Sequence, residues 1–141
     1  MRDLMSNIHP VSAIPLGPAV TDNSPFVGMV VDRRGFGSLV FVIHAGTLTT
    51  AGATFTPLVE HGDAADLSDA AAVPDDLLSG SEAMAGFTGA NDGVVRKVGY
   101  VGGKRYVRLT VTPSGNGAAA SLSAMAVLGH PVNAPTPNPP A

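Results

Sequence analysis

Apolar and polar residues alternate along several segments of the chain with the two-residue period of a β-strand that is buried on one face. The alternation is clearest from Tyr106 to Thr112, and it recurs from Thr54 to His61. The residues expected to point inward are Val107, Leu109 and Val111 in the first segment and Phe55 and Val59 in the second. Pro57 cannot donate a ladder hydrogen bond, so it indicates a sheet edge or a bulge in the second segment.

Two pairs of predicted strands are each joined by a short loop that contains glycine. Phe26 to Asp32 and Ser38 to His44 flank a loop with two glycines, and Val94 to Tyr100 and Tyr106 to Thr112 flank a loop with a Gly-Gly pair. Because glycine reaches the positive φ angles that tight turns need, this pattern predicts two β-hairpins. We expect the second hairpin, residues 94 to 112, to form the centre of one sheet.

A further strand is predicted from Ala119 to Leu128. Its alanines would also suit a helix, but glycines precede it, Gly129 to Pro131 follows it, and serines interrupt it, which together favour a strand. Before it, Gly62 to Phe87 carries six acidic residues and no lysine or arginine, and only Pro74 to Leu78 is typical of a helical turn. We expect this acidic segment to cross over the surface from one sheet to the other.

The two ends of the chain differ from its middle. Residues 1 to 25 hold four prolines among scattered apolar side chains, and residues 131 to 141 form a proline-rich tail. The sequence therefore predicts an extended N-terminal arm over residues 1–25, a folded domain over residues 26–130 and a tail over residues 131–141. The expected fold is all-β, an antiparallel two-sheet sandwich or jelly-roll-like domain of six to eight short strands.

Length and composition narrow the possible functions. The 141 residues suit one domain, and 13% of them are charged, about half the usual share, with a formal net charge of −3. Neither nucleic acid nor a membrane surface is an expected partner for such a chain. Cysteine is absent, which excludes disulfides and thiolate chemistry, and the sequence shows neither a signal peptide nor an apolar run long enough to span a membrane.

Familiar catalytic and metal-binding patterns are missing. The four histidines are not spaced to form a local metal pair, and the glycines near Lys104 lack the frame and the downstream helix of a phosphate-binding loop. Asp63, Asp66 and Asp69 could offer oxygen ligands to calcium, but the spacing of a calcium-binding loop is absent, so a solvated acidic loop is the favoured interpretation. We expect no catalytic residues, no cofactor and no metal, and hence a protein that is not an enzyme.

Charged residues are segregated along the sequence. Seven of the eleven acids lie between Glu60 and Glu82, whereas five of the eight basic residues lie on the predicted second hairpin, namely Arg96, Lys97, Lys104, Arg105 and Arg108. Both groups could be ordinary solvated faces. Alternatively, the acidic segment of one copy or of a partner could meet the basic hairpin of another, which would orient an interface.

Four strings of residues carry a family resemblance. They are Leu58 to Asp63 (LVEHGD), Leu67 to Leu78 (LSDAAAVPDDLL), Val98 to Asn116 (VGYVGGKRYVRLTVTPSGN) and Ala126 to Pro131 (AVLGHP). From about Val20 to Pro131 the chain resembles a family of small tailed-bacteriophage and prophage proteins that are encoded among the head genes near the major capsid protein. The resemblance implies a virion component and offers no catalytic residues, and the proline-rich tail is not part of it.

From this resemblance, together with size and composition, we expect a capsid decoration (cement) protein. Such a protein would be made in the host cytoplasm and would bind the major capsid protein on the outer capsid surface, and neighbouring copies of itself, with a homotrimer as one such arrangement. A head–tail junction or tail component, and a carbohydrate-binding jelly-roll module for host recognition, are the alternatives. The candidate interface residues are the five basic residues above together with Ile8, Val11, Ile14, Pro135 and Pro137.

Overall fold

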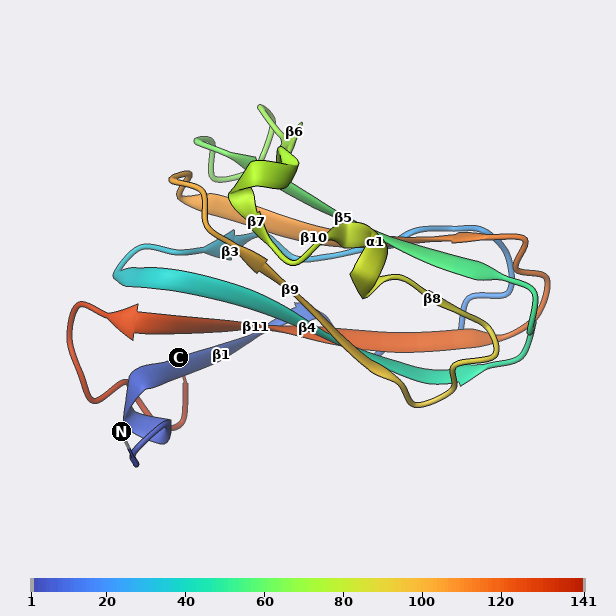
Figure 1. Cartoon of the computed structure of the whole chain (residues 1–141), viewed down its shortest axis with the longest axis horizontal. Helices are drawn as coiled ribbons and strands as arrows, with labels where there is room; N and C mark the ends of the chain where they lie inside the picture. The colour runs from blue at the N-terminus through green and yellow to red at the C-terminus, as the bar shows by residue number, and fades with distance from the viewer. Residues whose placement is uncertain (1, 141) are drawn as a thin grey trace.

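Two antiparallel β-sheets pack face to face in the computed structural model, which describes residues 2–140 (Figure 1). One sheet has five strands in the order β1-β11-β4-β9-β7, and the other has six, with β2, β10, β5 and β6 in line, β3 beside β10 and β8 beside β5. The strands are β1 (Ile8–Ile14), β2 (Phe26–Val27), β3 (Val31–Asp32), β4 (Phe36–Leu48), β5 (Thr54–Gly62), β6 (Ala71–Ala72), β7 (Leu78–Ser79), β8 (Phe87–Thr88), β9 (Val95–Tyr100), β10 (Tyr106–Ser114) and β11 (Ala120–Pro131). The predicted all-β two-sheet sandwich is confirmed. Its strands are more numerous than expected, because five of the eleven found in residues 2–140 are two residues long.

The core lies between the two sheets and follows the predicted alternation. The side chains of Val107, Leu109 and Val111 on β10 are fully buried, as are Phe55 and Val59 on β5, so both predicted inward faces are confirmed. Opposite them, β4 contributes Phe41 and Ile43, and β11 contributes Leu122, Ala126 and Leu128. The predicted last strand is also confirmed, since β11 runs as a strand along the whole length of β4.

Both predicted hairpins are wrong in their pairing. β3 pairs with β10 in the six-stranded sheet, while β4 pairs with β11 and β9 in the five-stranded sheet. Likewise β9 and β10 lie in different sheets, so residues 94–112 do not form the centre of one sheet. A five-residue loop can extend over about 16 Å, whereas packed sheets are about 10 Å apart, so the same loop length allows a crossing between sheets as readily as a hairpin.

Part of the N-terminal segment belongs to the sandwich, contrary to the arm that we expected. Residues Ile8 to Ile14 form β1, which pairs with β11 and closes one edge of the five-stranded sheet. The carbonyl of Ile8 accepts a hydrogen bond from Thr136, so the backbone polar groups of Ile8 point away from β11. Pro10 is two residues further along the strand, so its nitrogen points the same way. The N–H that proline lacks would therefore face the open edge of the sheet, where no ladder hydrogen bond is lost. Ile14 enters the core at the end of this strand and is 4% exposed.

The acidic segment crosses between the sheets as predicted. After β5 it forms β6 on the six-stranded sheet, then a 3-10 turn at Asp75–Leu77, and then β7 on the five-stranded sheet. A short helix, α1 (Glu82–Ala85), follows and was not predicted; Ser81 caps it by accepting a hydrogen bond from the Met84 amide at 3.1 Å. The amide of Val59 points away from β10 and donates to the Glu82 carboxylate. Pro57 is two residues earlier on the same strand, so its nitrogen points the same way. The N–H that proline lacks would lie in the gap between β6 and β8, where β5 has no strand partner.

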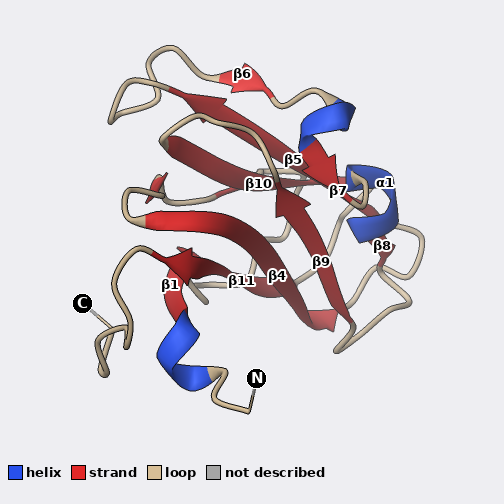
Figure 2. Ribbon diagram, turned by 60° about the vertical axis from the view of Figure 1, so that its left-hand side comes forward, coloured by secondary structure: helices blue, strands red, loops and turns tan. Residues whose placement is uncertain are grey.

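The two ends of the chain lie side by side at one end of the sandwich (Figure 2). The backbone amide of Thr136 in the tail donates to the Ser6 carbonyl at 3.0 Å, and the Thr136 hydroxyl donates to the carbonyl of Ile8. Thr136 itself is buried by these contacts. The C-terminal tail is therefore attached to the N-terminal segment of the same chain.

Candidate interaction surfaces

The basic residues of the predicted interface are mostly paired within the chain. Lys104 contacts Asp63 at 2.6 Å, Arg105 donates twice to the Asp32 carboxylate at 2.8 Å, and Arg108 contacts Glu60 at 3.1 Å. Arg108 and Glu60 are direct cross-strand neighbours on β10 and β5. Two of these three acids belong to the acid-rich stretch from Glu60 to Glu82, so the charge complementarity seen in the sequence is satisfied inside one molecule.

The remaining two basic residues do not share a face. Arg96 pairs with the inward-facing Ile43 across β9 and β4, and its guanidinium reaches the Gly86 carbonyl at 3.4 Å. Lys97, the next residue, is exposed on the opposite, outer face of the same sheet. The five basic residues therefore form no continuous basic patch, and Lys97 is the one that is exposed on the outer face of the five-stranded sheet. The interface role of the five residues stays a prediction.

The ion pairs and burial shift several pKa values. The hydrogen bonds from Arg105 lower the pKa of Asp32, and the hydrogen bond to Asp63 raises the pKa of Lys104. Burial, followed by the nearby Lys104 charge, lowers the pKa of His61, whose Nδ1 lies 2.7 Å from the Tyr100 hydroxyl. Each of these groups has a partner within the protein, as the members of a structural ion-pair network do.

The acidic loop does not assemble a cation site. The carboxylate of Asp69 accepts hydrogen bonds from the amides of Asp63 and Ala64, and that of Asp66 accepts one from the amide of Ser68. These bonds to backbone amides lower the pKa of both carboxyls. Within residues 2–140 no group of three or more potential metal-ligating side chains comes together.

A different surface stands out once the sheets are known, namely the outer face of the five-stranded sheet. We call it the apolar sheet face and define it by the outward-pointing residues of β1, β11, β4 and β9: Ile8, Pro10, Ser12, Ser123, Met125, Val127, Ser38, Val40, Val42, His44, Val95 and Lys97. Met125 is 48% exposed and Val95 56% exposed on this face. It carries no acidic residue and a single formal charge, that of Lys97.

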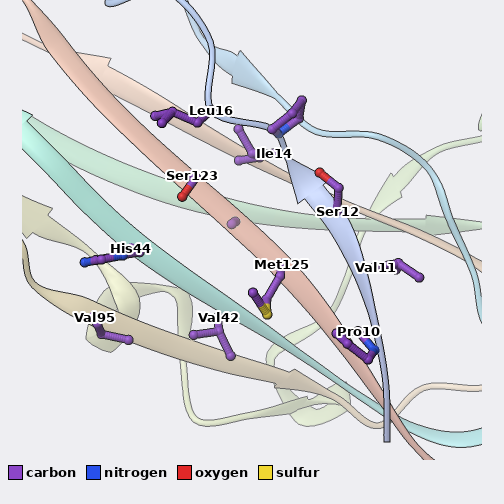
Figure 3. A pocket seen from close by; sticks show the side chains of 12 residues that line it. Pro10, Val11, Ser12, Ile14, Leu16, Val42, His44, Val95, Ser123 and Met125 are labelled. Atoms are coloured by element: carbon purple, nitrogen blue, oxygen red, sulfur yellow. The ribbon is translucent and has the colours of Figure 1, made fainter. Parts of the chain in front are cut away.

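Several shallow depressions lie on this face. One of them, about 550 Å³, runs across β1, β11, β4 and β9 and is lined by side chains such as Val42, Met125 and Pro10 (Figure 3). A second, about 320 Å³, continues it toward the chain ends beside Val40 and Val127. At the margin of the second depression, Ser38 Oγ lies 2.9 Å from Nδ1 of His130.

The outer face of the six-stranded sheet has the opposite character. It presents Arg108, Glu60, Tyr106 and threonines of β5 and β10, and its charges are paired as described above. Since both sheets bury their inner faces in the common core, the two outer faces are the surfaces left for partners. The apolar one is the candidate for a protein contact, because the main apolar patch on the surface of a folded protein is often functional.

The other predicted interface residues are dispersed. Ile14 is buried in the core, which corrects its assignment as an exposed interface residue. Val11 is half-buried and packs against the core, and its interface role stays a prediction. Ile8 is half-buried and lies on the apolar sheet face, while Pro135 and Pro137 are exposed in the tail on either side of the buried Thr136. The interface role of these three residues stays a prediction.

The sequence contained a signal for the apolar sheet face that we did not use. Leu39 to Ile43 is a run of five apolar residues, and Ala124 to Leu128 is another. A strand that is apolar at every position is usually covered on both faces. These two runs are the central strands β4 and β11, so they mark the sheet whose outer face needs a cover.

Comparisons with known proteins show the fold. No protein-family model and no curated protein matches the chain. The solved structure of the SPBc2 prophage-derived protein YomS is similar, with a TM-score of 0.50 and 8% identity over 86% of this chain and 92% of that one. At that identity the likeness establishes a shared sandwich architecture, and the resemblance to head-gene proteins stays a prediction.

Two further structures align less well. The Gt strain of infectious bursal disease virus matches with a TM-score of 0.48 and 13% identity, over 91% of this chain and 34% of the viral one. The CBM22-1–GH10 modules of xylanase 10B from Clostridium thermocellum, complexed with xylohexaose, match with a TM-score of 0.42 and 10% identity, over 92% of this chain and 27% of the xylanase chain. Nothing about the function of this chain follows from scores below 0.5.

Among residues 2–140, no helix has the length and apolar character needed to cross a membrane.

Proposed function

We propose that this chain is a non-enzymatic structural protein of a bacteriophage virion, a capsid decoration (cement) protein that binds the outer surface of the major capsid protein shell and stabilises it. The observation that carries the proposal is the apolar sheet face. A sheet that is apolar on both sides and uncovered on one is suited to an assembly in which another protein covers it.

Other features of the molecule support a structural role. The ion pairs of Lys104, Arg105 and Arg108 are closed within the chain, and the tail is attached to the N-terminal segment through Thr136. The three ion pairs neutralise six of the nineteen charged residues, and the net charge of −3 is small enough for copies to repeat on a lattice without strong mutual repulsion. The sandwich is also the fold of the prophage-derived YomS, which agrees with a phage origin.

A shell makes weak contacts effective. On a capsid each copy is held beside many others, so an interface of modest area per copy is strengthened by the high local concentration of its partners. A decoration protein therefore needs a rigid body and complementary surfaces rather than a reactive site. The apolar sheet face and the exposed residues beside it fit that requirement.

The test is the copy number of this protein in purified particles, measured by quantitative mass spectrometry against the major capsid protein. About one copy per capsid subunit, or one trimer per local threefold position, is the expected result. A dozen copies or fewer would move the protein to the head–tail junction or the tail, and its absence from particles would refute the virion role. Particles stripped of the protein should also release DNA at a lower temperature than complete particles do.

A further inference from the structure

We infer that the apolar sheet face is covered by the same face of a second copy of this chain, in a two-fold dimer with the two five-stranded sheets packed against each other. The inference deepens the proposed function by naming the partner at this face, and it rests on that function for the premise that the face is covered in the assembled state. It concerns the contact between neighbouring copies on the shell. The contact with the capsid protein would then use the remaining exposed surface, which includes the outer face of the six-stranded sheet.

The first argument is the charge of the face. A partner of different sequence is usually oriented by complementary charges, but this face offers it no acidic residue and only Lys97 as a fixed charge. A second copy needs no such complement, because an interface between identical faces must be compatible with itself, and an apolar face with one charge near its margin meets that condition. The copy also brings Val42, Met125 and Val127, which match the apolar surface that they would cover.

The second argument concerns Lys97, the one charge that self-association must accommodate. A two-fold axis parallel to the strands places β9 of one copy over β1 of the other, because the rotation reverses the strand order across the sheet. The two Lys97 side chains are then three strand spacings apart, about 14 Å, at opposite margins of the four-stranded contact and not against each other. Each Lys97 lies opposite Pro10 and Ser12 of the other copy, where the serine hydroxyl can accept a hydrogen bond.

The third argument is the area available. Seven residues of β4, Ser38 to His44, extend over about 23 Å, and four neighbouring strands span about 14 Å, so the flat footprint is about 320 Å². A standard interface buries about 800 Å² per partner, so the sheet face alone supports a weak dimer. Exposed apolar side chains at its margin enlarge it: Leu4, Leu16 and Met84 are 58%, 72% and 75% exposed, and each lines a depression on this side of the molecule.

The expected dimer is therefore weak in solution, with a dissociation constant on the order of 10–100 μM, and strong when many copies are held on one particle. Light scattering on a size-exclusion column should show a mass that rises from monomer to dimer as the loaded concentration increases. Met125→Asp should raise the dissociation constant at least about tenfold, since a buried unpaired carboxylate costs more than 1.4 kcal/mol. Leu58→Asp is the matched control, because Leu58 is exposed on the outer face of the other sheet.

The absence of native cysteine allows a second, geometric test. Packed sheets lie about 10 Å apart, beyond the reach of a disulfide, so the test uses a short bifunctional thiol reagent. A Ser123→Cys variant can be cross-linked only between molecules, because it holds one cysteine per chain, and it should be cross-linked faster than Thr56→Cys. Thr56 lies on the six-stranded sheet and is the more exposed of the two positions, so random collisions would favour the control. Circular dichroism verifies that each variant is folded.

Two results would overturn the inference. One is a wild-type chain that remains monomeric up to about 0.5 mM, well above the expected dissociation constant. The other is Thr56→Cys cross-linking as fast as Ser123→Cys. If the chain is monomeric and the thiol of the Ser123→Cys variant becomes protected from a thiol reagent on capsid shells, the face belongs to the capsid protein, and the proposed function survives without the dimer. If the dimer forms but particles lack the protein, the dimer stands and the proposed function fails.

Discussion

Ile14→Ala tests whether the N-terminal segment is part of the folded domain. Ile14 is 4% exposed at the end of β1 and packs into the common core. The substitution removes three carbon atoms, worth about 0.8 kcal/mol each in transfer free energy, and it leaves a cavity that the neighbouring side chains fill only in part. β1 is an edge strand with a bulge between Ser12 and Ile14, which permits some relaxation, so we expect a loss of about 3 kcal/mol in the free energy of unfolding.

The assay is urea-induced unfolding followed by far-UV circular dichroism, because the chain has no tryptophan. A domain of this size has about 5–15 kcal/mol of stability, so the variant should remain folded in buffer and unfold at a lower urea midpoint with an unchanged slope. Leu16→Ala, two residues further along and 72% exposed, is the control and should change the free energy of unfolding by less than about 0.5 kcal/mol. If Ile14→Ala were as stable as the control, residues 1–25 would be a detached arm and the sandwich would not include β1.

Three further predictions concern other contacts. Lowering the pH below about 6.5 should reduce the free energy of unfolding, because the pKa of His61 is lowered in the fold and the unfolded chain therefore binds more protons. In urea titrations at several pH values, His61→Gln should weaken this dependence of the free energy on pH. A variant with the same pH dependence as the wild type would contradict the role of His61. Thr136→Val removes the hydroxyl that donates to the Ile8 carbonyl, so it should speed proteolysis of the tail and lower the free energy of unfolding by about 0.5–1.5 kcal/mol. Equal cleavage rates for the variant and the wild type would show that the Thr136 hydroxyl does not hold the tail. Gly28→Ala should cost about 1–3 kcal/mol, because its Cβ would lie 2.1 Å from the Leu109 carbonyl oxygen, and a variant with wild-type thermal stability would refute that close approach.

The faces of the strands were predictable because their cause is local. In a strand, successive side chains point to opposite sides, so the alternation at Val107, Leu109 and Val111 identifies an inward face whatever that strand pairs with. The same reasoning placed Phe55 and Val59 inward, and the structure confirms all five. Sequence pattern therefore decided which side of each strand is buried.

The pairing of the strands was not predictable in the same way. A glycine-containing loop such as Val101 to Arg105 can turn a strand back beside its neighbour or carry it across to the other sheet, and both choices bury the same apolar faces. Here Arg33 stabilises the crossing, because its Nε donates to the Lys104 carbonyl at 2.8 Å and its guanidinium lies 5.1 Å from the Tyr100 ring centroid. These contacts join residues about seventy positions apart, which no local pattern reveals.

For the candidate surfaces too, part of the answer could be predicted from the sequence and part is visible only in the folded chain. The five basic residues were correctly seen as clustered in sequence, but their partners Asp32, Glu60 and Asp63 come from other strands and loops, so only the folded chain shows that three of the five charges are neutralised. The apolar sheet face, in contrast, was indicated by the uninterrupted apolar runs of β4 and β11. What was missing was the knowledge that these two strands are neighbours.

The sequence by itself determined an all-β sandwich, the inward faces of its main strands, the acidic crossover, and a composition without cysteine and with few charges. Each of these follows from residue type and short-range periodicity. The tertiary structure decided which strands share a sheet, that β1 is one of them, that most of the basic residues are paired within the chain, and that one sheet exposes an apolar face. Those outcomes depend on contacts between residues that are far apart in the sequence. Such contacts form only when the chain folds, so no short-range pattern in the sequence reveals them.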